Sequence, residues 1–266
     1  MKAVTGFFMA WGNFCAIPCP CKKWDEDARK HMLVMFPVIG LMMGLLWYGL
    51  FIVLQASHIA HPLAAALLTA YPFLVSGFIH LDGFMDCNDA ILSRRPLEER
   101  RRILKDSHVG AFAVITAILL FLVFFAAIWS ALEREAPWVM VSLIAIPVLS
   151  RAASARAVLA HEPLSTSQYE KTFDSEKNKG AKWIVTMIWI AAALLLIAGG
   201  SALGADAGLR WTASLRTFAV LAAVELAASV ISSAYGRKQL GGMSGDIAGF
   251  ILVWSELAAV VSLAVI

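Results

Sequence analysis

The sequence predicts an all-α, polytopic integral membrane protein with about seven transmembrane helices. Of its 266 residues, 60% are hydrophobic, against roughly 45 to 50% in an ordinary soluble domain. Only 15% are charged, where about 25% is usual. The charges are confined to short blocks, and the apolar stretches between them run about 18 to 24 residues. Each stretch is long enough to cross a hydrocarbon core of roughly 30 Å as a helix.

Hydropathy along the chain places the seven helices. They are expected at 33–54, 59–79, 109–132, 138–158, 183–203, 217–235 and 247–266. No block between them is long enough for a separate soluble domain. We therefore expect residues 1–266 to form a single membrane-embedded domain.

Positive charge differs sharply between alternate loops. Nineteen of the 22 Lys and Arg residues lie on one side of the predicted bundle, in the N-terminal block, at 80–108, at 151–182 and at Arg237 and Lys238. Because loops rich in Lys and Arg stay in the cytoplasm, the N-terminus and the loops at 80–108, 159–182 and 236–246 are expected to face the cytoplasm.

Composition also excludes two classes of protein. The net charge is only +3, and the basic residues form no single domain, so we expect no nucleic-acid partner. The four cysteines, Cys15, Cys19, Cys21 and Cys87, are too few and too unevenly placed for a disulfide scaffold. The first three could hold a metal, but no fourth ligand follows at a zinc-finger spacing.

An acidic motif, HLDGFMDCND, follows the second predicted helix. It places Asp82, Asp86 and Asp89 at i, i+4 and i+7, on one face of a helix. Carboxylates so arranged repel one another unless a cation lies between them, and Mg²⁺ is bound by carboxylate and phosphate oxygens. The motif predicts a metal and diphosphate site, the alternative being a solvated helix end. His80, just before it, is a candidate proton acceptor.

The same loop continues with a basic cluster that ends in Asp106. Arg102 and Lys105 are candidates for phosphate contacts, although arginines next to a membrane span are also ordinary topology determinants. Asp106 could serve as a fourth carboxylate, or as the N-cap of the next helix.

A glycine-rich turn, QLGGMSGD, precedes the last predicted helix on the same side. Gly241 and Gly242 would let the backbone approach a phosphate, and Asp246 begins the helix. The turn could also be only a tight connection. Because it and the acidic loop face one compartment, they can converge into one site.

Three ionisable residues, Arg151, Glu225 and Glu256, lie inside predicted spans. Such residues are costly in hydrocarbon and are functional candidates by default. Arg151 could instead extend to the interface. Glu256 is expected about 15 Å deeper than Asp246, so it suits orienting a partner better than binding the same metal.

Together these residues make the chain resemble the cobalamin synthase family, the adenosylcobinamide-GDP ribazoletransferases. Four blocks carry the resemblance and occur in the family's order: AIPCP with FPVIGLMMGLLW, GFIHLDGFMDCNDA, RRRILKDSHVGAF and RKQLGGMSGDIAGFILVWSE. The chain departs from the family's usual residues at 87–88, Ala90, His108 and 243–244, which puts in doubt the anion contact at residue 108 and not the reaction class.

The resemblance implies a Mg²⁺-dependent transferase of the bacterial inner membrane with its site facing the cytoplasm. It would join adenosylcobinamide-GDP to alpha-ribazole, or to its 5′-phosphate, and release GMP. We expect Asp82, Asp86 and Asp89 as metal ligands, with Asp106 or Asp246 completing the metal shell or acting as base. The other site candidates, for substrate contacts or proton transfer, are His80, Arg102, Lys105, Arg151, Gly241, Gly242 and Glu256. A homo-oligomer is compatible with all of this.

Two other readings compete with this one. A CDP-alcohol phosphotransferase or a prenyltransferase also uses aspartate-rich Mg²⁺ sites, but neither matches the four blocks. A transporter, with Glu225 and Glu256 as coupling residues, would be expected to show inverted repeats, or spans broken by Gly or Pro at corresponding positions, and we find neither in the sequence.

Overall fold

A computed structural model describes residues 2–22, 24–134, 136–165, 167, 175–206 and 211–265. Parts of two predicted loops, 168–174 and 207–210, lie outside the described residues. Within them the chain is helical, with a single isolated β-bridge between Pro163 and Met243. This confirms the all-α class.

Six helices are long and apolar enough to cross a membrane. They are α2 (Arg29–Ala56), α6 (Ala111–Glu133), α7 (Ser142–Ala160), α8 (Ser175–Asp206), α9 (Trp211–Leu240) and α10 (Gly245–Val265). The short 3₁₀ helices η1 (Glu26–Ala28) and η2 (Pro137–Val141) lead into α2 and α7. A seventh crossing arises if α3 (His61–Val75) and α4 (Ile79–Leu92), which meet at 90°, count as one broken span.

The helix predicted at 59–79 ends four residues earlier than expected, at Val75. α3 stops at Val75, where Gly77 and Phe78 adopt φ values of +63° and +62°. The Gly77 amide donates to Leu74 O at 3.0 Å, and the Phe78 amide to Phe73 O at 2.9 Å. This is the hydrogen-bond pattern of a Schellman helix end. Hydropathy missed it because the apolar run continues through the turn.

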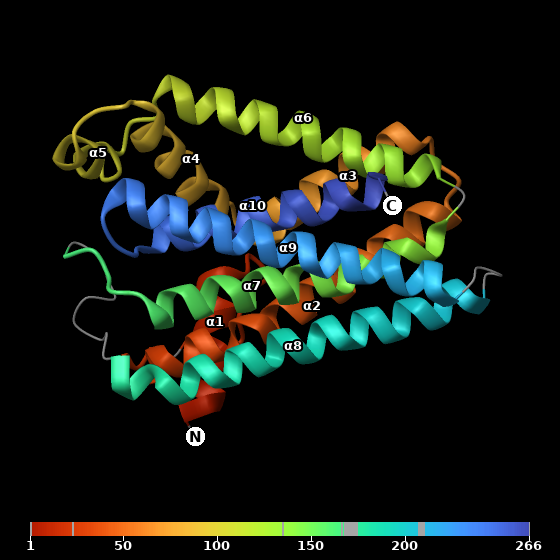
Figure 1. Cartoon of the computed structure of the whole chain (residues 1–266), viewed down its shortest axis with the longest axis horizontal. Coiled ribbons are helices and arrows are strands. Elements are labelled where there is room, and N and C mark those ends of the chain that lie inside the picture. The colour runs from red at the N-terminus through yellow and green to blue at the C-terminus, as the bar shows by residue number, and fades with distance from the viewer. Residues whose placement is uncertain are drawn as a thin grey trace.

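The loops that share the positive charge lie at one end of the bundle (Figure 1). α4, α5 (Leu97–Ile103), the end of α7, the start of α8 and the turn between α9 and α10 meet there. The C-terminal helix ends at the opposite end. The two groups of loops predicted from charge are thus separated in space as expected.

The amino-terminal helix α1 (Lys2–Phe14) packs along the first half of α2. Gly6 lies against His31, since a Cβ at Gly6 would come within 2.6 Å of the His31 backbone. The sequence did not predict this helix, because the stretch is shorter than a membrane span.

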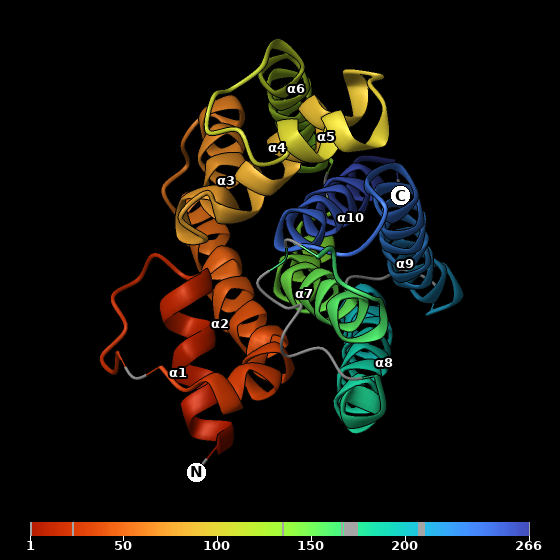
Figure 2. The same ribbon diagram turned by 90° about the vertical axis from the view of Figure 1, so that its left-hand side faces the viewer.

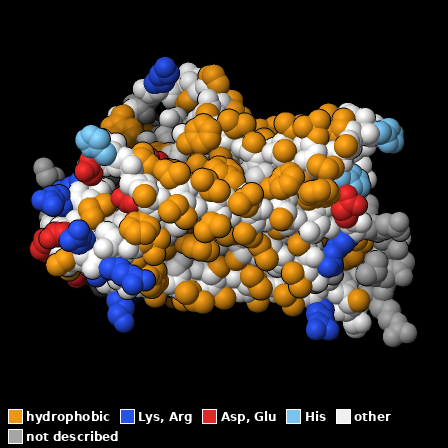
Figure 3. Space-filling model, turned by 90° about the horizontal axis from the view of Figure 1, so that it is seen from above, with side chains coloured by type: hydrophobic (Ala, Val, Ile, Leu, Met, Phe, Trp, Pro, Cys, Tyr) orange, Lys and Arg blue, Asp and Glu red, His pale blue; other side chains and the backbone are white. Residues whose placement is uncertain are grey.

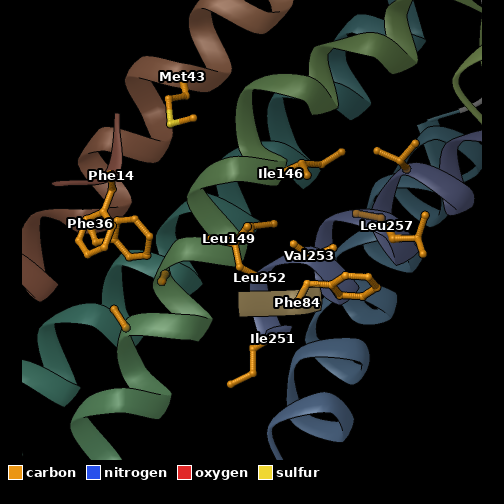
Figure 4. Close-up of a cluster of buried hydrophobic side chains, with 14 of the residues drawn as sticks. Phe14, Phe36, Met43, Phe84, Ile146, Leu149, Ile251, Leu252, Val253 and Leu257 are labelled. Carbon is orange, nitrogen blue, oxygen red and sulfur yellow. The ribbon is translucent and has the colours of Figure 1, made fainter. Parts of the chain in front are cut away.

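α2 and α7 pack against each other over much of their length (Figure 2). A Cβ at Gly40 would lie 2.3 Å from Pro147 O, and one at Gly44 would lie 2.3 Å from Ile144 O. Glycines four residues apart let two helix backbones approach closely in a membrane. Figure 4 shows buried side chains on both sides of α7. Among them are Phe14 and Phe36, whose ring centroids lie 4.4 Å apart.

The outer surface is a broad apolar band with charged side chains at both ends (Figure 3). Only 33% of the most apolar window of α6 and 28% of that of α8 is buried inside the bundle. These faces need an apolar surrounding, which agrees with a multi-pass membrane protein.

Candidate active site

Two helices from distant parts of the chain, α4 and α10, bring the acidic residues together. A Cβ at Gly83 would lie 2.8 Å from both Cα and O of Asp246, and a Cβ at Gly249 would lie 2.8 Å from His80 O. Phe84 of α4 also stacks on Phe250 of α10 at 6.1 Å. Because a glycine lies at both contacts, the two helix backbones come close together. The carboxylates of α4 therefore lie directly beside the start of α10.

A cavity of about 190 Å³ opens at this contact. Three of the candidate site residues, Asp82, Asp246 and His80, line it together with Asn13 of α1 and Ser154 of α7. We call it the carboxylate pocket. Asn13 and Ser154 could not be predicted from the sequence, since neither belongs to a motif with a chemical spacing and both reach the pocket only through helix packing.

The predicted aspartates share one region of charge. The nearest ionised neighbours of Asp86 are Asp82, Asp246 and Asp89. None of the four forms an ion pair with a described Lys or Arg. Asp89 points to the start of α6, where a Cβ at Gly110 would lie 2.1 Å from both of its carboxylate oxygens. A group of carboxylates without an ion-pair partner among the described residues favours a cation.

The arrangement of these carboxylates suits a metal ion that is bound partly by the protein and partly by the substrate. In the described part of the chain, no three His, Cys, Asp or Glu side chains form a ready metal cage. Mg²⁺ usually takes one or two carboxylates, substrate phosphates and waters rather than an all-protein cage. Asp82 and Asp246 in one pocket, with Asp86 next to them, fit this mode of binding.

His80 sits at the inner wall of the carboxylate pocket. Its ring packs between Phe14, at 5.8 Å, and Phe36, at 5.5 Å, and only 7% of the residue is exposed. Its buried Nε2 has no hydrogen-bond partner in the described residues. An imidazole nitrogen without a partner is available to accept a proton from a bound group.

The basic cluster of the 80–108 loop divides into two parts. Arg100 donates to Gln239 O at 3.0 Å, and Arg101 donates to Leu240 O at 3.0 Å and to Gly241 O at 3.2 Å. These guanidinium groups cap the last carbonyls of α9, a favourable position for positive charge. They join the acidic loop to the glycine-rich turn, which confirms that the two loops converge.

Arg102 and Lys105 remain exposed, and neither forms an ion pair with a described residue. Their neighbour Asp106 accepts hydrogen bonds from the His108 amide at 3.0 Å and pairs with its ring at 2.7 Å. These bonds, with the charges of His108 and Arg102, lower the pKa of Asp106. Asp106 is not an N-cap, since α6 begins at Ala111 and Gly110 holds that position.

The glycines of the turn have close protein neighbours. Gly241 has a φ of +83°, which favours glycine. A Cβ at Gly242 would lie 2.9 Å from the side chain of Leu164, whose amide donates to Met243 O at 2.8 Å. The turn thus holds part of the 159–182 loop as well, so three loops meet at this end of the bundle.

Arg151 and Glu256 lie inside the bundle and face each other. Arg151 is 1% exposed and Glu256 3% exposed, and Arg151 Nη1 donates to Glu256 Oε1 at 2.8 Å. Arg151 therefore does not extend to the interface. Its guanidinium lies 5.6 Å from the Phe36 ring, which lines the carboxylate pocket, so the pair lies beneath the pocket wall. Glu225 is fully buried nearby, with both oxygens unpartnered in the described residues.

Fold and site together define a polytopic helical membrane protein with a carboxylate pocket at the basic end of its bundle. Comparison with known proteins narrows this class. The chain matches the model of the CobS family, described as cobalamin-5-phosphate synthase, over residues 6–264. It belongs to this family.

Individual relatives agree with the match over nearly the whole chain. An adenosylcobinamide-GDP ribazoletransferase of Clostridium perfringens strain SM101 is 37% identical over 258 residues, covering 97% of this chain and 96% of the relative. A Clostridium botulinum protein of the same name is 37% identical over 259 residues, with the same coverage. One from Geobacillus kaustophilus is 26% identical over 260 residues, covering 96% and 93%. No solved structure matches the chain.

Proposed function

We propose that the protein joins adenosylcobinamide-GDP to alpha-ribazole, or to its 5′-phosphate, giving adenosylcobalamin or its phosphate and GMP. The observation that carries this is that Asp82 of α4 and Asp246 of α10 line one cavity, at the end of the bundle where Arg102 and Lys105 are exposed. Full-length similarity to proteins named for this reaction supports it. The protein would work in a bacterial inner membrane, with the pocket facing the cytoplasm where nucleotides are found.

The reaction is a displacement at phosphorus. A ribose hydroxyl of the base-bearing substrate forms a bond to the cobinamide-side phosphorus, the bond from that phosphorus to the GMP oxygen breaks, and the hydroxyl proton passes to a base. Arg102 and Lys105 would hold the diphosphate, because both are exposed cations without an ion-pair partner in the described residues. Their charge would favour the GMP oxygen as it leaves.

The carboxylates would hold Mg²⁺ between protein and substrate. Asp82, Asp86 and Asp246 are suited to this. Asp89, on the same helix as Asp82 and Asp86, has its carboxylate against Gly110 at the start of α6. When bound, Mg²⁺ supplies positive charge to the phosphate oxygens. His80 is our candidate base, since the residue lines the same pocket and its buried Nε2 has no hydrogen-bond partner in the described residues, and Asp246 or Asp106 remain the alternatives.

The test is a direct assay. Membranes containing the protein, given adenosylcobinamide-GDP, alpha-ribazole 5′-phosphate and Mg²⁺, should form a cobamide and release GMP in equal amounts, both measured by liquid chromatography and mass spectrometry. Parallel samples should receive unphosphorylated alpha-ribazole, a CDP-alcohol or a prenyl diphosphate. Turnover of the last two with none of the first would contradict the proposal in favour of another diphosphate transferase.

A further inference from the structure

A second cavity, of about 440 Å³, lies on the outside of the bundle. α8 and α9 flank it, and α7 forms its floor, on the opposite face of α7 from the carboxylate pocket. The three helices are adjacent in Figure 2. We call this cavity the α7–α9 groove. Its apolar part is lined by Ala152, Ala153, Ala157, Trp189, Ile190, Leu226, Val230 and Ala234.

One end of the groove is basic. Arg156 and His161, near the end of α7, and Arg237, in the last turn of α9, line it. Lys182, in the first part of α8, lies close by. Because α7 and α9 run in the same direction and α8 runs back, these basic residues share the end of the bundle that holds the active-site loops.

The two arginines are not neutralised by described acidic residues. Arg156 donates to Thr186 Oγ1 at 3.1 Å and Arg237 to Ser233 Oγ at 3.3 Å, and neither has a carboxylate within 4.0 Å in the described part of the chain. The pKa of His161 is lowered, first by burial and then by the charges of Arg237, Arg156 and Lys182. Positive charge gathered at the mouth of an apolar groove is complementary to an amphiphilic anion.

The length of the groove fits a lipid chain. Along α9, the lining runs from Leu226 to Arg237 through residues three or four apart, which form one stripe. Eleven residues of helix rise about 16 Å. That span places an acyl chain along the stripe while a headgroup reaches the arginines at the membrane interface.

We propose that the α7–α9 groove binds an anionic phospholipid, with its phosphate held between Arg156 and Arg237 and one acyl chain along α9. The exposure of Leu226, Val230 and Ile190, at 43%, 58% and 40%, supplies the apolar surface for that chain. Pockets of basic residues between membrane helices recognise anionic headgroups in this way. The site is separate from the carboxylate pocket, and this inference does not depend on the proposed reaction.

Native mass spectrometry of the delipidated full-length protein in detergent tests this. Dioleoylphosphatidylglycerol should bind more tightly than dioleoylphosphatidylcholine, and the double change Arg156→Gln with Arg237→Gln should remove the preference. Each basic residue near an anionic headgroup is worth roughly fivefold in affinity, so about 25-fold should be lost. Arg216→Gln with Arg134→Gln, on arginines assigned to the opposite end, should change little.

Two further variants separate charge from shape and from misfolding. Lys at both positions, Arg156→Lys with Arg237→Lys, should keep the preference, while Ala153→Leu should weaken binding of both lipids by filling the groove. Equal binding of the two lipids by the wild type, or an unchanged preference in the Gln variant, would overturn the proposal. Displacement of bound phosphatidylglycerol by GMP would also overturn it, since the groove would then belong to a substrate phosphate.

Discussion

Arg151 of α7 and Glu256 of α10 form an ion pair inside the bundle, although 105 residues separate them in the chain. Ser150 also donates to Glu256 Oε1, at 2.9 Å. A single charged side chain inside a membrane span is energetically costly, and here each residue supplies the countercharge of the other. The pair ties α7 to α10 directly beneath the wall of the carboxylate pocket.

Loss of one partner should therefore destabilise the protein more than loss of both. Glu256→Ala leaves the Arg151 guanidinium buried without its countercharge, which costs about 3 to 5 kcal/mol. Replacement of both residues by Met should recover most of that loss. Unfolding in mixed micelles, followed by circular dichroism, measures the difference. A double variant less stable than Glu256→Ala would show that the pair is not the source of the effect.

The contact between α4 and α10 gives a second prediction. Gly83→Ala would place a methyl group 2.8 Å from the Asp246 backbone, which cannot move aside as a side chain can. The helices must separate, and we expect turnover per inserted molecule to fall about tenfold or more, since small misplacements of reacting groups are costly. Gly49→Ala is the matched control, because Gly49 lies in a helix with nothing within 4 Å. Equal turnover in both variants would contradict the prediction.

Much of the fold follows from local patterns in the sequence. Six spans can be read from hydropathy, and the partition of loops between the two ends follows from their Lys and Arg content. The break after Val75 is harder to predict, because the turn residues are themselves apolar. Asp82 and Asp246 could be predicted as site residues, but Asn13 could not, because its position depends on how α1 packs on α2 and not on any local motif.

The basic loop should separate into residues that act on the substrate and residues that do not. Ala at both Arg102 and Lys105 should raise KM for adenosylcobinamide-GDP or lower kcat, because these exposed cations have no ion-pair partner in the described residues. Ala at Arg94 and Arg95, which we expect to act mainly in orientation, should leave turnover per inserted molecule nearly unchanged. Steady-state kinetics of the purified variants measures kcat and KM for both pairs. A similar loss of activity in the two double variants would contradict this prediction.

The orientation of the bundle can be tested at its far end. The C-terminal helix ends opposite the loops that carry nineteen of the Lys and Arg residues. Because such loops remain in the cytoplasm, alkaline phosphatase fused after Ile266 should be active, and green fluorescent protein fused there should not fluoresce. The reverse pattern would place the carboxylate pocket outside the cytoplasm, away from nucleotide substrates.

The aspartates of α4 are expected to act as one unit. Asp82→Asn, Asp86→Asn and Asp89→Asn should each nearly abolish cobamide formation while membrane insertion stays intact, because Asn keeps the size of the side chain and removes its charge. Groups that act together lose function non-additively, so a double variant should be little worse than a single one. Turnover of purified protein across a Mg²⁺ titration measures this.

Metal dependence separates the roles within this unit. Asp82 lines the carboxylate pocket, whereas Asp89 lies against Gly110 at the start of α6. A variant that has only lost metal affinity should recover in part at high Mg²⁺ or with Mn²⁺. We expect this for Asp82→Asn more than for Asp89→Asn, because of these two residues only Asp82 lines the pocket. Should the triple Asn variant keep wild-type turnover with the same Mg²⁺ dependence, the aspartates are a solvated helix end and the catalytic charge lies elsewhere.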